Sequence, residues 1–376
     1  MKTTESTGAV IGKTLIMSVT ALIILLGLPI VFLIALIAGL AGLGAATADS
    51  QDLAGGLSTE FVAGERSAGT RLVAVPVIGP ILGEDRGGGG FLTAASGVTY
   101  GYSIKEHLLE LADDDDVDGI LLELDTPGGT IYGSKAIADG VAEYQAKTGN
   151  PVVAYVGGIS ASGGVYAMAG ADEIVADHGT LVGSIGVIFG PFVRYRDITA
   201  VDNGILFGGV ETTGGVEFEY LTAGRSKDLG SPYRDMTAEE RKILEEGLDN
   251  AYDDFVAHVA DGRGLTESQI KNDLGALIFG EQQAVANGLV DTIGAREDAW
   301  ERLAELAGAA GADWRLDRSL PGEPSFLDLL TGAATDGPEP AARVNLPAVC
   351  TGTATLLTYH GEPSQLCASL RSVPGE

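Results

Sequence analysis

Two glycine-rich turns in the sequence combine residue types that suit acyl-transfer chemistry. They are D-T-P-G-G at 125–129 and A-S-G-G at 161–164, and each follows a short apolar run. A serine at the junction of a strand and a helix exposes its hydroxyl, and a helix N-terminus favours developing negative charge. Backbone N–H groups of glycine turns can hold the oxyanion of a tetrahedral intermediate. We therefore expect Ser162 as a nucleophile, with Gly163 and Gly129 as oxyanion-hole donors.

A serine nucleophile also needs a general base, and histidine is the usual one. The four histidines are scattered and form no motif: His107, His178, His258 and His360. A lysine serves instead when burial lowers the pKa of its amine enough for it to be neutral. Of the eight lysines, two flank the apolar N-terminal segment and five fall on expected helices, which leaves Lys227 in a loop. An ordinary surface charge is the alternative interpretation of Lys227.

The segments around these turns alternate between strand and helix. Short, nearly continuous apolar runs predict strands buried in a parallel sheet, at residues 72–78, 119–124 and 152–156. We expect helices over residues 134–147 and 237–262. Thr237 and Glu240 form a capping box that opens the second helix. This alternation predicts the α/β class.

The composition excludes several other kinds of protein. The 376 residues carry a formal net charge of −29, from 52 acidic and 23 basic side chains, so no nucleic-acid partner is expected. Cys350 and Cys367 are the two cysteines, which excludes a disulfide framework for the whole fold but allows one local bridge outside the cytoplasm. With two cysteines and scattered histidines, we expect no structural zinc site.

The N-terminal segment is long and apolar. Positions 14–48 hold no charged residue, and about 20 apolar residues suffice to span a bilayer as a helix. We expect a transmembrane anchor over residues 14–45, with the lipid bilayer as a partner. Because Lys2 and Lys13 precede it, the positive-inside rule predicts a cell-membrane protein with a cytoplasmic N-terminus and the rest outside. A cleaved signal peptide is the alternative, since A-T-A at 46–48 looks like a cleavage site.

Over about residues 70–310, the chain resembles the bacterial signal peptide peptidase A (SppA) peptidases. Seven motifs carry this resemblance: D-T-P-G-G at 125–129, A-S-G-G at 161–164, T-L-V-G-S-I-G-V at 180–187, R-S-K-D at 225–228, M-T-A-E-E-R at 236–241, G-R-G-L-T at 262–266 and A-N-G-L-V-D at 286–291. The resemblance implies a ClpP/crotonase-like domain with repeated β-β-α units. One departure bears on the substrate groove: Val165 follows Ser-Gly-Gly where the family usually has an aromatic residue.

The resemblance also implies a role for each matching residue. Ser162 is similar to the family's nucleophile and Lys227 to its general base. Ser184 matches a serine that accepts a hydrogen bond from the lysine amine, while Gly129 and Gly163 match the oxyanion-hole donors. Family members form ring-shaped homo-oligomers in which the base can come from a neighbouring subunit. The implied enzyme is a serine endopeptidase for peptides such as signal-peptide remnants, without a metal or cofactor.

The predicted organisation has five parts. They are a cytoplasmic N-terminus (1–13), the anchor (14–45), a linker (46–70), an SppA-like peptidase domain (71–310) and a C-terminal tail without an assigned structure (311–376). Two other functions stay open at this point. One is a crotonase-type acyl-CoA enzyme on the same fold, which an acyl-CoA binding test would detect. The other is a catalytically silent, membrane-anchored scaffold ring, which an active-site serine probe would not label.

Overall fold

The computed structural model describes residues 59–84, 97–192, 221–309, 311, 313–319 and 357–359. The chain divides into two compact units, Met1–Leu57 and Ser58–Glu376, and all described residues belong to the second. The predicted anchor at 14–45 lies outside the described residues. Within the described ranges, no helix is long and apolar enough to cross a membrane.

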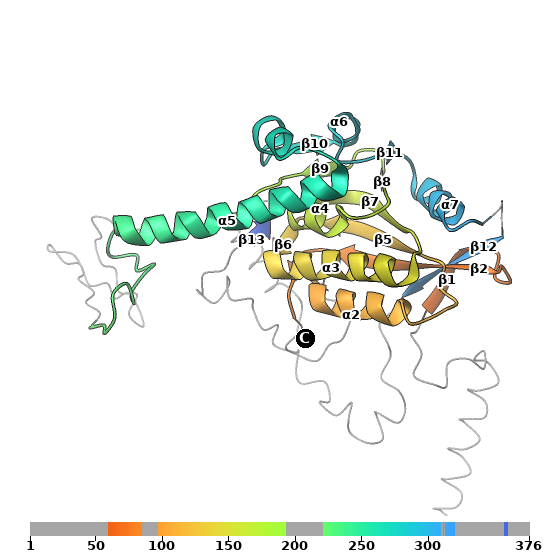
Figure 1. Cartoon of the computed structure of the whole chain (residues 1–376), viewed down its shortest axis with the longest axis horizontal. Helices are drawn as coiled ribbons and strands as arrows, with labels where there is room; N and C mark the ends of the chain where they lie inside the picture. Colours follow the sequence, from red (N-terminus) through yellow and green to blue (C-terminus); the bar gives the residue numbers. More distant parts are fainter. Residues whose placement is uncertain are drawn as a thin grey trace, which may run out of the picture. The chain divides into compact units, whose positions relative to one another are not determined.

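A mostly parallel sheet forms the centre of the second unit (Figure 1). Its strands, in spatial order, are β1 (Thr59–Gly64), β12 (Trp314–Ser319), β2 (Thr70–Ile78), β5 (Gly119–Thr126), β7 (Val152–Ala161), β8 (Glu173–Ala176) and β11 (Thr292–Ile293). Beside them, β9 (Leu181–Gly183) pairs in parallel with β7, and β10 (Ile278–Gly280) pairs antiparallel with β9. Only β1 runs antiparallel to its neighbour in the main order. The central strands are apolar on both faces because helices cover both faces.

A second, smaller sheet continues from the first. Its order is β13 (Leu357–Tyr359), β6 (Gly128–Thr130), β3 (Ile81–Leu82) and β4 (Thr99–Tyr100). Strand β2 leads through β3 and β4 into α2 (Gly101–Leu111), and β5 leads through β6 into α3 (Ile131–Thr148). The predicted α/β class with repeated β-β-α units is therefore confirmed in the described part of the chain.

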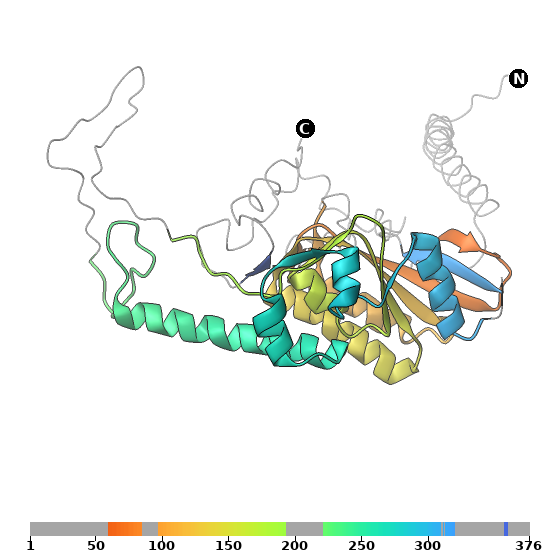
Figure 2. The ribbon, with the colours of Figure 1, turned by 90° about the horizontal axis from the view of Figure 1, so that it is seen from above.

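Helices cover the two faces of the large sheet. On one face, α2 and α3 pack against each other (Figures 1 and 2). On the other, α7 (Arg296–Leu306) places Trp300 and Leu303 in a core cluster with Leu72, Leu121 and Val153. Each such buried side chain contributes about 1.5–3 kcal/mol relative to an exposed one. The strands that lead into the glycine turns are thus packed on both faces.

The sheet extends beyond the predicted peptidase domain at 71–310. Strand β1 lies inside the segment 46–70, which the sequence suggests to be a linker, and β12 and β13 lie inside the tail. β1 and β12 pair with each other, for example at Phe61 and Asp317, and β12 also pairs with β2. Pairing between such distant segments depends on tertiary contacts, so local composition does not reveal it.

The longest helix, α5 (Ala238–Arg263), begins at the predicted capping box. Thr237 Oγ1 accepts a hydrogen bond from the Glu240 N–H (3.1 Å), and Glu240 Oε2 accepts one from the Thr237 N–H (2.8 Å). The C-terminal half of α5 contacts α4 (Gly163–Met168) and buries Phe255, Val256 and Val259. The N-terminal half extends away from the sheet (Figures 1 and 2). A π-helix (Gln269–Leu274) and α6 (Glu281–Ala286) follow.

His107 on α2 links that helix to the strand β12. The ring is 2% exposed, and its Nε2 lies 2.7 Å from Ser319 Oγ. Burial lowers the pKa of His107 to about 4. The imidazole is therefore neutral in the folded chain at neutral pH.

This burial predicts a loss of stability in acid. The unfolded imidazole titrates near pH 6.5, so between about pH 6.5 and about pH 4 the unfolded state binds more protons. The free energy of unfolding should fall by about 3 kcal/mol across this window on account of His107. Urea unfolding at the two ends should show a smaller fall for His107→Gln, whereas His178→Gln, at an exposed position, should behave like the parent. An unchanged acid dependence in His107→Gln would contradict the assignment.

Candidate active site

Ser162 lies where β7 ends and α4 begins, in an unusual backbone conformation. Its φ is 54° and its ψ is −109°, and the residue is 1% exposed. These angles match the first central position of a type II′ turn, which favours glycine. A serine there costs about 1–3 kcal/mol in strain, which the surrounding structure must offset. Such strain in a buried serine is typical of a functional position.

Main-chain hydrogen bonds fix this turn beside β9. The Ser162 N–H donates to the Gly183 carbonyl oxygen (2.7 Å), and the Ser162 hydroxyl lies 3.4 Å from the Gly186 carbonyl oxygen. In the β7–β9 ladder, Ala161 pairs with Gly183. Ser162 and Ser184, which follow these two residues, therefore lie side by side at the ends of paired strands. Ser184 also has a positive φ (59°) and is 8% exposed.

The two predicted oxyanion-hole glycines lie on elements that touch. Gly163 opens α4, Gly129 lies in β6, and α4 contacts β6. A Cβ on Gly129 would lie 1.8 Å from the Ile81 carbonyl oxygen, so no larger residue fits there. On the next residue of the serine turn, a Cβ on Gly164 would lie 2.7 Å from Thr126 Cγ2. Gly129 and Gly164 thus have no room for a larger side chain, because strands β3 and β5 approach them closely.

Thr126 belongs to the motif at 125–129, but the sequence alone indicates no individual role for it. Its side chain is fully buried; the hydroxyl donates to the Gly79 carbonyl oxygen (2.6 Å) and accepts from the Gly128 N–H (3.1 Å). These two bonds fix the direction of the chain between β5 and β6. Thr126 therefore orients the turn that carries Gly129. The feature of the sequence that could have pointed to this role is the threonine inside a glycine-rich turn.

Lys227 lies apart from these residues in the same chain. It is exposed, in a turn that precedes α5. Phe255, further along α5, packs on the ring of Tyr166 at 5.0 Å, and the Tyr166 N–H donates to the Ser162 carbonyl oxygen (3.0 Å). At 1.5 Å per residue, Ala238 at the start of α5 is about 26 Å from Phe255 along the helix. The structure thus brings the predicted nucleophile, both glycines and Ser184 together, but not the predicted base.

His258, the histidine of α5, packs against Tyr166. Its ring stacks on Tyr166, with centroids 4.3 Å apart, and its Nε2 lies 2.9 Å from the Tyr166 carbonyl oxygen. Burial lowers the pKa of His258. These contacts join α5 to α4, in agreement with a structural rather than a catalytic interpretation.

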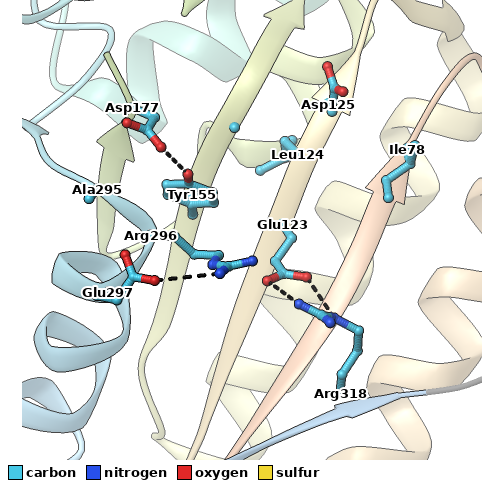
Figure 3. Close-up of a pocket in the computed structure, with 11 residues that line it drawn as sticks. Ile78, Glu123, Leu124, Asp125, Tyr155, Asp177, Ala295, Arg296, Glu297 and Arg318 are labelled. Atoms are coloured by element: carbon cyan, nitrogen blue, oxygen red, sulfur yellow. Dashed lines mark hydrogen bonds and ion pairs between the residues drawn. The ribbon is translucent and has the colours of Figure 1, made fainter. Parts of the chain in front are cut away.

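A separate groove of about 410 Å³ lies on the sheet face that α7 covers in part (Figure 3). Its polar side chains bind one another: Arg318 with Glu123, Tyr155 with Asp177, and Arg296 with Glu297. Neither Ser162 nor Lys227 lines it. Among the described residues, no group of three or more His, Cys, Asp or Glu side chains is arranged to hold a metal ion. None of the predicted site residues lines this groove, so the Ser162 turn is the candidate active site.

Comparison with known proteins tests the predicted family resemblance. Residues 144–310 match Peptidase family S49. The similarity to this peptidase family therefore covers residues 144–310 of the 376 residues. This confirms the predicted resemblance to SppA, and Ser162, Gly163, Ser184 and Lys227 lie inside the matched residues, whereas Gly129 precedes them.

Several proteins that are similar in sequence to this chain carry protease names. "Putative protease MJ0651" of Methanocaldococcus jannaschii is 36% identical over 204 residues, which is 54% of this chain and 61% of that protein. "Putative signal peptide peptidase SppA" of Enterococcus faecium is 37% identical over 196 residues, 52% of this chain and 53% of that protein. The chain thus spans between 53% and 61% of the length of these relatives. Among solved structures, a point mutant of ClpP1 from Listeria monocytogenes matches 60% of this chain and 93% of its own, at 14% identity and a TM-score of 0.36.

The strained backbone of Ser162 leads to a prediction about stability. Ser162→Gly and Ser162→Ala both remove the hydroxyl, but only glycine adopts the positive φ without strain. We expect Ser162→Gly to have a free energy of unfolding about 1 kcal/mol above that of Ser162→Ala. Denaturant unfolding measures this difference.

A matched pair serves as the control for this prediction. Ser160 lies two residues earlier in the extended strand β7, where glycine is less favourable than alanine. Ser160→Gly should therefore be less stable than Ser160→Ala. The same sign at both positions would show that the backbone at Ser162 is not strained.

Proposed function

We propose that the protein is a membrane-anchored serine endopeptidase in which Ser162 is the nucleophile and Lys227 the general base. The observation that carries the proposal is the strained, buried Ser162 in a peptidase S49 domain, with Gly129 and Gly163 on contacting elements beside it. The protease names of the relatives support the same reaction class. The apolar segment at 14–45 is the basis for the membrane anchor and for an extracytoplasmic peptidase domain.

In the proposed reaction, Lys227 takes the proton of the Ser162 hydroxyl. The serine oxygen attacks the peptide carbonyl, and the N–H groups of Gly129 and Gly163 hold the oxyanion, each worth about 3 kcal/mol. The lysine then gives its proton to the leaving amine, and water hydrolyses the acyl-enzyme. Ser184, beside Ser162 at the end of β9, accepts a hydrogen bond from the lysine amine and orients it.

In this proposal, Lys227 acts on Ser162 of a neighbouring copy in a ring-shaped homo-oligomer. The length of α5 between the Lys227 loop and the contact of Phe255 with Tyr166 supports this arrangement. A rigid helix cannot fold the loop back onto its own Ser162. A head-to-tail contact that repeats around a closed ring supplies every serine with a lysine. A monomer is then inactive.

The substrate is an extended peptide that pairs with the edge of β6. The chain's own strand β13 supports this view, because it pairs antiparallel with β6, with Thr358 opposite Gly129, and contacts α3 and α4. Addition of a strand to a sheet edge is a common mode of peptide binding. We infer that signal-peptide remnants and other membrane-associated polypeptides, cut at small or apolar residues, bind along this edge.

Complementation between inactive variants tests the proposed reaction. Ser162→Ala and Lys227→Ala should each abolish cleavage of a fluorogenic apolar peptide while the oligomer persists. After dissociation and reassembly of an equal mixture, about one quarter of the sites combine an intact serine with an intact neighbouring lysine, so about a quarter of the activity should return. An inactive mixture would contradict a base from the neighbouring copy, and an active Lys227→Ala would contradict the base itself.

Removal of β13 tests the proposed binding edge. Without residues 350–376, the edge of β6 is open to peptides, so KM should fall by about tenfold with kcat unchanged. A tenfold change corresponds to about 1.4 kcal/mol, which is the scale of one net hydrogen bond. Deletion of residues 361–376 alone keeps β13 and should leave KM unchanged. Steady-state kinetics of the two truncated proteins would contradict the proposal if both retained the parental KM.

A further inference from the structure

Arg234, in the loop before α5, binds two carboxylates at once. Its Nε and Nη2 donate to the two Asp228 oxygens at 2.6 and 2.7 Å. Its Nη2 and Nη1 also donate to the two Glu240 oxygens at 2.7 and 2.9 Å. A planar guanidinium can make such paired bonds to two partners, which the single ammonium of a lysine cannot reproduce.

Glu240 is the fixed point of this cluster. The residue is 4% exposed and lies in the first turn of α5, where its carboxylate also accepts from the Thr237 N–H. Arg234 first, then the Thr237 N–H and the Ser226 hydroxyl, hold the pKa of the Glu240 carboxyl well below its usual range. Arg234 likewise lowers the pKa of Asp228. The carboxylates therefore stay ionised and bound to the helix end at neutral pH.

The residues on both sides of Lys227 are tied to this cluster. Ser226 hydrogen-bonds to Glu240, and Asp228 binds Arg234. Ser226 also has a positive φ of 64°, a conformation that the turn imposes at a cost. Lys227 lies between them and is exposed. The backbone is thus held on both sides of the lysine while its side chain is exposed.

The other ion pairs at this end of α5 are weaker. Arg241 lies 3.8 Å from Glu245 and Lys242 lies 3.6 Å from Glu246, and all four side chains are exposed. Arg225 and Glu239 pair at 3.0 Å, but the two side chains are 81% and 52% exposed. Exposed pairs of this kind contribute little to conformation. Among the described residues of this loop and the first turns of α5, the Arg234 cluster is the one that combines burial with paired bonds.

We propose that Arg234 is a positioning residue that, together with Glu240 and Asp228, holds the Lys227 turn at a fixed place on the N-terminus of α5. This inference rests on the proposed role of Lys227 as base. A base carried on a helix that extends from the body must arrive at the neighbouring serine within a fraction of an ångström. Helix α5 spans the distance to the neighbouring copy, and the Arg234 cluster fixes the position of Lys227 at the end of that helix.

The test compares Arg234→Met with Arg234→Lys and with the control Arg241→Met, in the full-length protein. Because a misplacement of about 1 Å can cost about 100-fold in rate, we expect Arg234→Met to lower kcat by about 10- to 100-fold with little change in KM. Arg234→Lys should recover part of this loss, and Arg241→Met should equal the parent. Light scattering records the oligomer of each variant.

The outcomes separate this inference from the proposed function. If Lys227→Ala is inactive and Arg234→Met is fully active, the positioning role is wrong and the base assignment stands. If Lys227→Ala is active, both are wrong. A rise in KM that matches the fall in kcat would indicate a general structural role and overturn the inference. If Arg234→Met does not assemble, Asp228→Asn, which leaves the Arg234–Glu240 pair in place, must lower kcat in the intact oligomer or the inference falls.

Discussion

The geometry of the candidate active site depends on one main-chain hydrogen bond, from the Ser162 N–H to the Gly183 carbonyl oxygen. It joins the end of β7 to the end of β9 and holds Ser162 at a positive φ that a serine does not adopt unaided. The neighbouring features follow from this bond. Ser184 comes beside the serine, and the turn becomes so tight that Gly164 meets Thr126. Packing of the sheet on both faces offsets the strain, so the serine is placed by the fold rather than by a flexible loop.

The length of α5 is the second constraint. Its last turns are buried against α4, while its first turns carry a loop folded onto the helix end by ion pairs. A helix of 26 residues is about 39 Å long, so groups fixed to its two ends cannot meet in one chain. If Lys227 is the base, the enzyme divides its nucleophile and base between copies. Activity then depends on assembly, which would prevent an isolated chain from cleaving proteins before the ring closes.

The sequence predicted the local features well and the distant ones less well. The glycine turns, the helix 237–262 and the capping box of Thr237 and Glu240 depend on neighbouring residues, and the structure contains all of them. The pairing of β1 with β12 joins segments about 250 residues apart, which no local pattern encodes. The Arg234 cluster could not be predicted from the sequence for a different reason. Asp228, Arg234 and Glu240 look like ordinary surface charges until the loop folds back and buries one of them.

Two features that are unfavourable for stability lie at or near proposed catalytic groups. One is the strained backbone of Ser162. The other is the buried carboxylate of Glu240, because the desolvation of an ion pair often exceeds its Coulombic gain, and an apolar replacement of similar volume is often as stable. A hydrophobic contact could hold the loop against α5, but it would leave the loop free to slide and rotate. The paired bonds of a guanidinium fix direction as well as distance. Specified geometry, rather than stability, is therefore the physical reason for charges at the end of α5.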